Sequence, residues 1–450
     1  MSNEFRIGKV RGYRRGKIWY LCYNEQGRRH RPRVGPDRNA ARQLASQINS
    51  QLDVGAPAAL SFESITIEKA RQQWLEHHEQ VSRSSINTIH RYRTATDHLL
   101  RFLDLKPVRT IAQFTPSHAA EFVAYLRSIR VSPNGHERTI KRPLLDGGLI
   151  YVLETCRTLF SYAKKRRYLS PYAENPFQVL NIDRIPIEEF RPIELFKPEE
   201  ERVFLQQCDE WQFPIFLTLM LTGMRPGEMC HLLVPEDIDL EKGSLRIRNK
   251  PRLGWQIKTR NERDIPLVPE LVEVLKLHVS RYPSGPLFRR STWNSGPRNL
   301  VTASQAMIER ELNLRMVREE LRAKRALERI EKLRIARALW NEMGALQEDR
   351  LRIEFTHVTQ AIGLSHQSAP KVLRHMFATT LQEGRVDPII RNLLMGHSIS
   401  SDRNSSHGLG MTAVYTHTQA GTIREQLTEA MQRREAIKVA REWLRIQATN

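Results

Sequence analysis

The segment KVLRHMFATTL, residues 371–381, lies inside a run of sequence with helical periodicity. Lys371 and Arg374 are three residues apart, so a helix places both side chains on one face. Such a pair is weak evidence alone, because charged side chains on a helix are usually just solvated. Its meaning depends on the polar residues that the flanking sequence adds.

Four more short motifs surround this segment, and each offers one polar side chain: Arg225 in TGMRPGE (222–228), Lys258 in QIKTRNERDIPL (256–267), His397 in LLMGHS (393–398) and Tyr415 in YTH (415–417). The first motif predicts an arginine on a Gly-flanked turn that enters a helix. The second is strand-like, and with residues 243–249 it predicts a β-hairpin whose second strand carries the lysine.

These five motifs, in this order, resemble the tyrosine recombinase family, also called the phage integrases. The family shows T-G-x-R-x-x-E, a hairpin lysine, H-x-L-R-H-x-F-A-T, L-G-H and a tyrosine just before T-H. The resemblance covers residues 196–426 as motifs. It implies a site-specific DNA recombinase that cleaves and rejoins DNA through a 3′-phosphotyrosine intermediate. It also implies that the enzyme integrates and excises a mobile element or prophage.

The resemblance carries roles over to individual residues. Tyr415 is the implied nucleophile, and Lys258 is the implied donor of a proton to the leaving 5′ oxygen. The guanidinium groups of Arg225 and Arg374 suit the charge that gathers on the phosphate oxygens in the transition state. His397 adds a hydrogen bond to one of these oxygens. The resemblance implies no cofactor and no metal, because cationic side chains take the place of a metal ion.

The sequence departs from the family pattern at two places. Lys371 stands where the family usually has histidine; a lysine can still donate to a phosphate oxygen, but it is a poor base near neutral pH. We therefore expect Lys371 in the catalytic set, with a nearby nonessential cation as the alternative. The 116 residues from Lys258 to Arg374 also exceed the expected spacing, because residues 303–341 form a charged insertion without Gly or Pro. One long helix, or two packed as a hairpin, fits this insertion.

The first 55 residues predict a separate β-rich domain. Residues 1–35 contain ten Lys and Arg against two Glu, and residues 17–34 have the pattern of a hairpin. A helix follows to about residue 52. We expect this domain to resemble the arm-site DNA readers of the family, with arginines at its DNA-binding surface. The candidates are Arg14, Arg15, Arg28, Arg29, Arg31 and Arg33.

The rest of the chain predicts a mainly α fold with small β elements, of the α+β class. Residues 65–180 read as four helices that resemble a SAM-like core-binding domain, and the Pro-rich residues 181–195 read as a linker. Residues 196–450 then form the mixed helical catalytic domain, with its β-hairpin and long insertion. Residues 423–446 predict an amphipathic helix that docks on a neighbouring subunit, as the resemblance implies, or on its own domain.

Composition restricts the partners. Lys and Arg number 71 against 50 Asp and Glu, a net charge of +21, so a polyanion is the expected partner. No apolar run is long enough to span a membrane, and the first ten residues contain no apolar signal core. The four cysteines lie far apart and lack the close pairs of a zinc site. We therefore expect a protein of the bacterial cytoplasm that associates with DNA.

The resemblance implies double-stranded DNA with core and arm sites as the substrate, a homotetramer on DNA, and room for accessory DNA-bending or directionality factors. Three alternatives remain at this stage. A resolvase usually lacks the extra N-terminal domain, and a type IB topoisomerase uses similar residues as a monomer. A catalytically inactive DNA-binding protein would not need intact Arg225, Lys258, Arg374, His397 and Tyr415.

Overall fold

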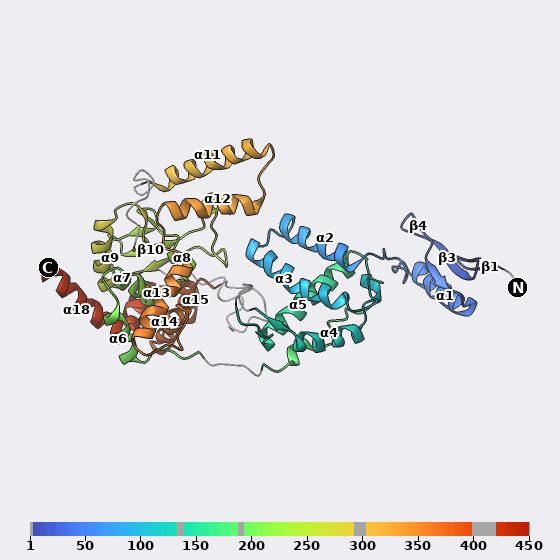
Figure 1. The fold of residues 1–450 in the computed structure, drawn as a ribbon, viewed down its shortest axis with the longest axis horizontal. Helices are drawn as coiled ribbons and strands as arrows, with labels where there is room; N and C mark the ends of the chain where they lie inside the picture. Colours follow the sequence, from blue (N-terminus) through green and yellow to red (C-terminus); the bar gives the residue numbers. More distant parts are fainter. Residues whose placement is uncertain (1–2, 133–138, 188–192, 292–302, 398–419, 450) are drawn as a thin grey trace. The chain divides into compact units, whose positions relative to one another are not determined.

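The computed structural model describes residues 3–132, 139–187, 193–291, 303–397 and 420–449. The chain divides into two compact units, residues 1–191 and residues 192–450. Figure 1 shows the helices and the few small sheets of both units, a mainly helical α+β fold as predicted. The division falls inside the predicted linker, residues 181–195.

The N-terminal part of the first unit is a five-stranded antiparallel sheet with one helix on it. The strands are β1 (Glu4–Ile7), β2 (Val10–Arg15), β3 (Ile18–Glu25), β4 (Arg28–His30) and β5 (Arg33–Gly35), and the helix is α1 (Arg38–Asp53). β3 is central, pairing with β2, β4 and β5. Its alternate residues Leu21 and Tyr23 are buried against Ala45 and Ile48 of α1. The other face of the sheet therefore stays free of the helix.

The second part of the same unit is a helical bundle with its own core. Its helices are α2 (Ile67–Gln80), α3 (Ile86–Leu103), α4 (Pro116–Ser128) and α5 (Asp146–Lys165). Side chains of Thr66, Ser85 and Thr115 accept hydrogen bonds from the first turns of α2, α3 and α4. These caps satisfy backbone donors that have no partner within the helix, so they fix where each helix starts. Four helices were predicted here, and all four are present.

The second unit is built around α7 (Gln212–Thr222), whose residues 213–222 are all buried. A helix that is apolar on every side needs neighbours on every side. They include α6 (Pro198–Gln207), α9 (Pro269–Arg281) and α14 (Lys371–Glu383). The shorter elements are α8 (Pro226–Met229), β8 (Leu233–Val234), β9 (Ile238–Asp239), β12 (Gly285–Pro286), α13 (Glu348–Ala361) and α15 (Pro388–Met395).

The predicted hairpin is present, but its second strand is shorter than predicted. β10 (Ser244–Ile247) pairs with β11 (Arg263–Pro266), so Lys258 lies in a turn of the connection and not in a strand. Lys250 and Trp255 exchange two backbone hydrogen bonds of 3.1 Å, which close the predicted connection between the strands. The extended backbone is broken further on, where the Arg260 N–H donates 2.9 Å to the Ile257 carbonyl and Arg260 adopts a positive φ of 60°.

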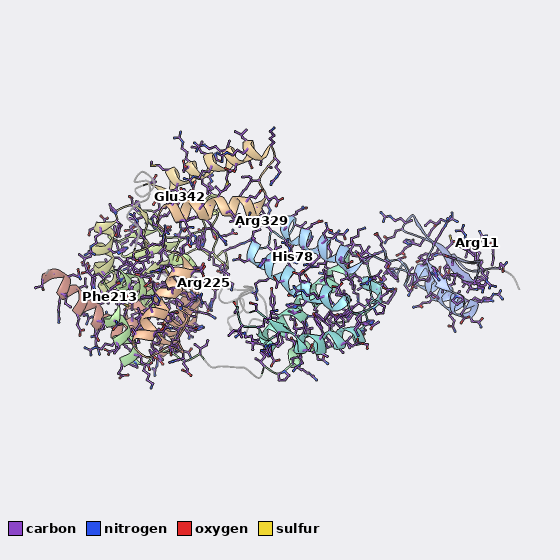
Figure 2. The ribbon with its side chains drawn as sticks, in the orientation of Figure 1. Arg11, His78, Phe213, Arg225, Arg329 and Glu342 are labelled. Atoms are coloured by element: carbon purple, nitrogen blue, oxygen red, sulfur yellow. The ribbon has the colours of Figure 1, made fainter. Side chains whose placement is uncertain are left out.

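The insertion forms two helices, α11 (Gln305–Ala323) and α12 (Arg329–Glu342), which confirms the hairpin alternative. Arg329 and Glu342, labelled in Figure 2, mark the two ends of α12. Residues of both helices, such as Ile308 and Leu339, share one small core. Towards the far end of α11, the apolar side chains of Val317 and Leu321 are exposed, 45% and 73% respectively, while Glu320 accepts 3.2 Å from the Leu327 backbone and pairs with Lys332 of α12.

The C-terminal segment is two helices and not one: α17 (Ala420–Met431) and α18 (Glu435–Thr449). Arg434 stands at the break, and its buried guanidinium donates to both carboxylate oxygens of Glu201, at 3.0 and 3.2 Å, and to the Met220 carbonyl. Trp443 stacks on Phe213 of α7, with ring centroids 4.8 Å apart. The apolar side of α18 thus packs on its own domain in this structure, the alternative to docking on a neighbour.

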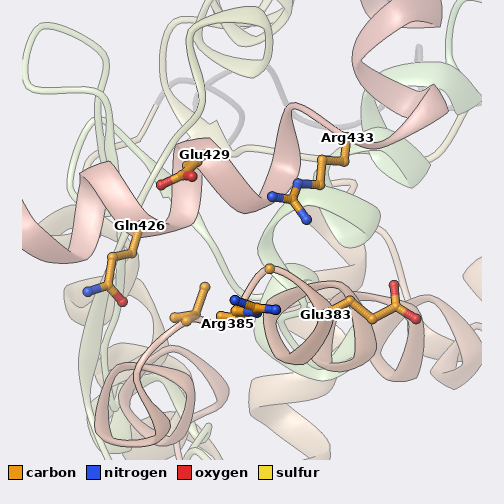
Figure 3. Close-up of a pocket in the computed structure, with 7 residues that line it drawn as sticks. Glu383, Arg385, Gln426, Glu429 and Arg433 are labelled. Atoms are coloured by element: carbon orange, nitrogen blue, oxygen red, sulfur yellow. The ribbon is translucent and has the colours of Figure 1, made fainter.

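A polar hollow of about 530 Å³ lies between α17 and the end of α14 (Figure 3). It is lined by Glu383, Gly384, Arg385, Val386, Gln426, Glu429 and Arg433. The Gln426 side chain closes one edge by accepting a hydrogen bond of 2.9 Å from the Asp387 backbone. None of the predicted catalytic residues that the structure describes lines this hollow. Among the described residues, no helix has the length and apolar character needed to cross a membrane.

Candidate active site

The turn after α7 places Arg225. Gly223 ends the helix with φ = +58°, and a Cβ on it would lie 2.1 Å from the Phe377 ring. Only glycine satisfies both conditions, because other residues strain at this φ and need the space that the ring occupies. The chain then turns, buries Met224, and starts α8 with Arg225 as the N-cap residue. This explains why the motif needs its glycine two residues before its arginine.

Glu228 holds the Arg225 turn closed. Its carboxylate accepts 2.9 Å from the Arg225 backbone N–H and 2.8 Å from the Arg225 guanidinium. It also accepts 2.7 Å from Arg263 of β11, a buried ion pair. Burial would raise the pKa of Glu228, but the hydrogen bonds and charge of Arg263, with those of Arg225, hold the pKa below its usual value. Glu228 is therefore an anion that two arginines share.

Backbone carbonyls at the end of α15 accept hydrogen bonds from three other segments. The carbonyl of Leu394 accepts 2.9 Å from Arg263, that of Met395 accepts from Arg374, and that of Gly396 accepts 3.1 Å from the Thr259 hydroxyl. Carbonyls at a helix end have no partner within the helix and carry its partial negative charge. Cationic donors therefore suit this end, and α15 becomes the point where the site's segments meet.

Arg374 is buried in the centre of this arrangement. Besides Met395, its guanidinium donates 2.6 Å to the Gly223 carbonyl, and it lies 3.5 Å from Nε2 of His397. Burial lowers the pKa of Arg374 to about 10, and the nearby charges of Arg225 and Arg263 act in the same direction. The side chain stays cationic near neutral pH. Three guanidinium groups thus surround one carboxylate, which leaves a local excess of positive charge.

The structure brings Arg225, Arg374 and His397 together, although 172 positions separate the first from the last in the chain. Lys258 is exposed, and its neighbour Thr259 ties that turn to the residue before His397. Lys371 is exposed at the first residue of α14, on the same helix as Arg374. Tyr415 lies outside the described residues.

Sequence reasoning missed Arg263, which binds Glu228 and Leu394 from within the hairpin. A signal was available: Arg263 and Ile265 are two residues apart, so a strand points both to one face, and Ile265 is fully buried. An arginine that points inward needs a carboxylate or carbonyl partner. Within the described residues, no group of three or more His, Cys, Asp or Glu side chains could hold a metal ion.

All six N-terminal arginine candidates are exposed, but they do not share one face. Arg15, Arg29 and Arg33 pair with Ile18, Asn24 and Tyr20, the residues of β3 that point away from α1. Arg14 and Arg28 pair with Trp19 and Glu25, which point towards the helix, and Arg31 lies between β4 and β5. On the free face, Tyr13 and Tyr20 stack with ring centroids 5.7 Å apart. That face, with three candidates and two tyrosines, is the stronger candidate for a nucleic-acid surface.

Comparisons with known proteins give one family match and several similar folds. A model of the phage integrase family matches residues 195–421, half of the chain. Similar solved structures include the integrase of the transposon Tn1549 in complex with circular intermediate DNA, with 16% sequence identity and a TM-score of 0.50. That match covers 81% of this chain and 99% of the other. A lambda integrase dimer bound to a COC′ core site has 14% identity and a TM-score of 0.43, covering 92% and 95%. No curated protein matches this sequence.

The role of the carbonyls at the end of α15 can be tested with a single Gly→Ala substitution, which adds one methyl group. A Cβ on Gly396, where φ is +61°, would lie 2.6 Å from Nη1 of Arg263, so Gly396→Ala should displace Arg263. The matched control is Gly363→Ala, where φ is +78° and nothing lies within 4 Å of the added carbon. Both variants should lose about 1–2 kcal/mol of unfolding free energy from backbone strain, measured by urea denaturation. Only Gly396→Ala should also lose DNA cleavage, by about tenfold or more. Equal cleavage by the two variants would contradict the role given to these contacts.

Proposed function

The chain belongs to the phage integrase family of site-specific recombinases, and we propose that it cuts and rejoins DNA with Tyr415 as nucleophile, integrating and excising a mobile element. The observation that carries this assignment is the cluster of Arg225 and Arg374 beside His397, in which guanidinium groups outnumber the single carboxylate Glu228. A buried excess of positive charge is costly unless an anion completes it. A DNA phosphate is the anion that a basic protein of this family meets.

In the first step, the Tyr415 oxygen attacks the scissile phosphorus. A bond forms between that oxygen and phosphorus, and the bond to the 5′ oxygen breaks, leaving the 3′ phosphate joined to the protein. The transition state concentrates negative charge on the nonbridging oxygens, where Arg225, Arg374 and His397 stabilise it. Arg374 is already fixed by the Gly223 and Met395 carbonyls, so little reorganisation is needed when the charge develops.

The leaving 5′ oxygen needs a proton, and Lys258 is positioned to supply it. Two observations support this role: Thr259, the next residue, donates to the carbonyl of Gly396, which precedes His397, and Lys258 itself is exposed. The phosphotyrosine bond keeps the energy of the broken phosphodiester. A 5′ hydroxyl from another strand can therefore attack the phosphorus, release Tyr415 and seal the new junction without an added nucleotide.

Lys371 is proposed as an additional phosphate contact. It begins α14, three residues before Arg374, so the two side chains lie on one face of the helix. A lysine can donate to a phosphate oxygen but is a poor base near neutral pH. The proton of Tyr415 therefore has to leave to another acceptor or to water.

Double-stranded DNA is the proposed partner of all three predicted domains: residues 1–55 as arm-site reader, 65–180 as core-binding domain and 196–450 as catalytic domain. Strand exchange joins four DNA ends, so it needs four active sites, and we propose that four copies of the chain assemble on two duplexes. The solved lambda integrase tetramer bound to a Holliday junction is an example of such an assembly.

The identity of the nucleophile is tested by Tyr415→Phe, which removes one hydroxyl and leaves the charge of the protein unchanged. A DNA substrate nicked near the cleavage position should trap the wild-type protein as a covalent adduct, and the variant should form none. The control Tyr282→Phe alters a partly exposed tyrosine of the same unit and should form the adduct normally. An adduct that persists in Tyr415→Phe would assign the chemistry to another residue.

The arm-site surface is tested by two triple variants of equal charge. The first variant changes the three arginines of the free face to Ala: Arg15, Arg29 and Arg33. The second variant changes three exposed arginines elsewhere in the domain to Ala: Arg14, Arg28 and Arg31. The slope of log affinity against log salt, measured on a mixed-sequence duplex, should fall by about 2–3 for the first variant, because each phosphate contact contributes about 0.9. For the second variant it should fall by less than about 1. Equal slopes for the two variants would show that the free face does not bind DNA.

A further inference from the structure

The insertion packs directly on the loop that carries Lys258. That loop leaves β10, forms a short 3-10 turn at Pro251–Leu253 and returns as β11. Leu253 is fully buried in the same core as Ile308 of α11 and Ala336 of α12. At Gly254, where φ is +70°, a Cβ would lie 2.5 Å from Cβ of Ala336. The insertion therefore approaches this turn so closely that only glycine fits.

Trp340, near the end of α12, makes a buried polar contact in this interface, beside the exposed pair of Arg252 and Glu309. Its indole Nε1 donates 3.0 Å to the Leu253 carbonyl, and the side chain is almost fully buried. Its ring meets the ring of His231 edge-on, with centroids 4.8 Å apart. A buried carbonyl that loses its only donor costs more than an average hydrogen bond, so this contact constrains where the turn can lie.

Between Leu253 and Lys258, two further contacts fix the loop, and a third follows Lys258. Trp255 stacks on the other side of His231, with ring centroids 4.8 Å apart and planes at 17°. The backbone N–H of Ile257, the residue before Lys258, donates 3.0 Å to the side chain of Asn249. After Lys258, Thr259 donates to Gly396. The loop around Lys258 is thus held on one side by contacts with the insertion and on the other by a hydrogen bond to the catalytic cluster.

His231 connects the same interface to the Arg225 turn. Its Nδ1 lies 2.7 Å from the Gly227 carbonyl, which can only accept, so Nδ1 carries the hydrogen. Burial lowers the pKa of His231 to about 4, so the ring is neutral near neutral pH. Gly227 belongs to α8, two residues after Arg225. One aromatic contact therefore joins the insertion to both loops that carry catalytic candidates.

We propose that Trp340 is a positioning residue for Lys258, and that the α11–α12 insertion acts as a fixed brace for the lysine-bearing loop. This inference rests on the proposed role of Lys258 as the proton donor to the 5′ oxygen. The brace acts through geometry alone: Trp340 touches neither the DNA nor the reacting phosphate. Its loss lets the loop shift, which lowers the fraction of complexes in which the ammonium group reaches the leaving oxygen.

The test compares Trp340→Phe with Lys258→Ala on two DNA substrates, one ordinary and one with sulfur in place of the leaving 5′ oxygen. A thiolate leaves without a proton, so the sulfur substrate bypasses Lys258. Trp340→Phe keeps an aromatic side chain but loses the indole N–H, and it should cleave ordinary DNA about 10- to 100-fold more slowly. On the sulfur substrate its rate should return to within about twofold of the wild type. DNA affinity by gel shift should not change. The control Leu321→Ala, at the exposed end of α11, should match the wild type on both substrates.

Each other outcome overturns a specific claim. A Trp340→Phe variant with normal rates, or with the same loss on both substrates, would refute the positioning role, since damage to the fold is not relieved by a better leaving group. If Lys258→Ala is slow on both substrates while the insertion is intact, the proton-donor assignment itself fails, and the brace fails with it. Rescue of Lys258→Ala without rescue of Trp340→Phe refutes the brace alone.

Discussion

The three carbonyls at the end of α15 are the contacts on which the rest of the site depends. Leu394, Met395 and Gly396 accept hydrogen bonds from Arg263, Arg374 and Thr259, which come from the hairpin strand, from α14 and from the lysine turn. Arg374 is itself assigned to the chemistry, Thr259 follows Lys258 in the chain, and Arg263 binds Glu228, which also holds Arg225. A helix end with unpaired carbonyls attracts such donors because it carries partial negative charge and no internal partners.

Charge balance within the site explains how it can be both stable and reactive. Glu228 compensates Arg225 and Arg263, and backbone carbonyls satisfy Arg374, so no guanidinium is buried without a partner. An uncompensated buried charge would cost several kcal/mol. With three arginines and one carboxylate, however, the compensation is incomplete. A phosphate diester supplies the missing negative charge. The transition state carries more negative charge than the substrate, so the site stabilises it more strongly, which is the condition for catalysis.

Much of the fold could be predicted from periodicity and capping residues, because local signals determine where helices start. Examples are the four helices α2 to α5, three of them capped by Thr66, Ser85 and Thr115, and the two helices of the insertion. Features set by distant contacts were not visible. The break in the C-terminal segment at Arg434, for example, depends on Glu201, which lies 233 positions earlier in the chain.

The candidate site shows the same division. The motifs identified Arg225, Arg374 and His397, and the structure brings them together. They did not identify Arg263 or Trp340, because each acts through one partner far away in the chain: Glu228 for the first, Leu253 for the second. Whether a buried polar side chain has a partner depends on where the fold places that partner, and no local sequence pattern encodes this position.

The most direct test is a structure of the protein on nicked core DNA with vanadate at the cleavage position, which mimics the five-coordinate phosphorus. The account predicts the Tyr415 oxygen and the 5′ oxygen at opposite apices, with Arg225, Arg374 and His397 on the equatorial oxygens. Arg374 should still donate to the Gly223 and Met395 carbonyls. A different side chain at the apex, or Arg374 released from both carbonyls, would contradict the account.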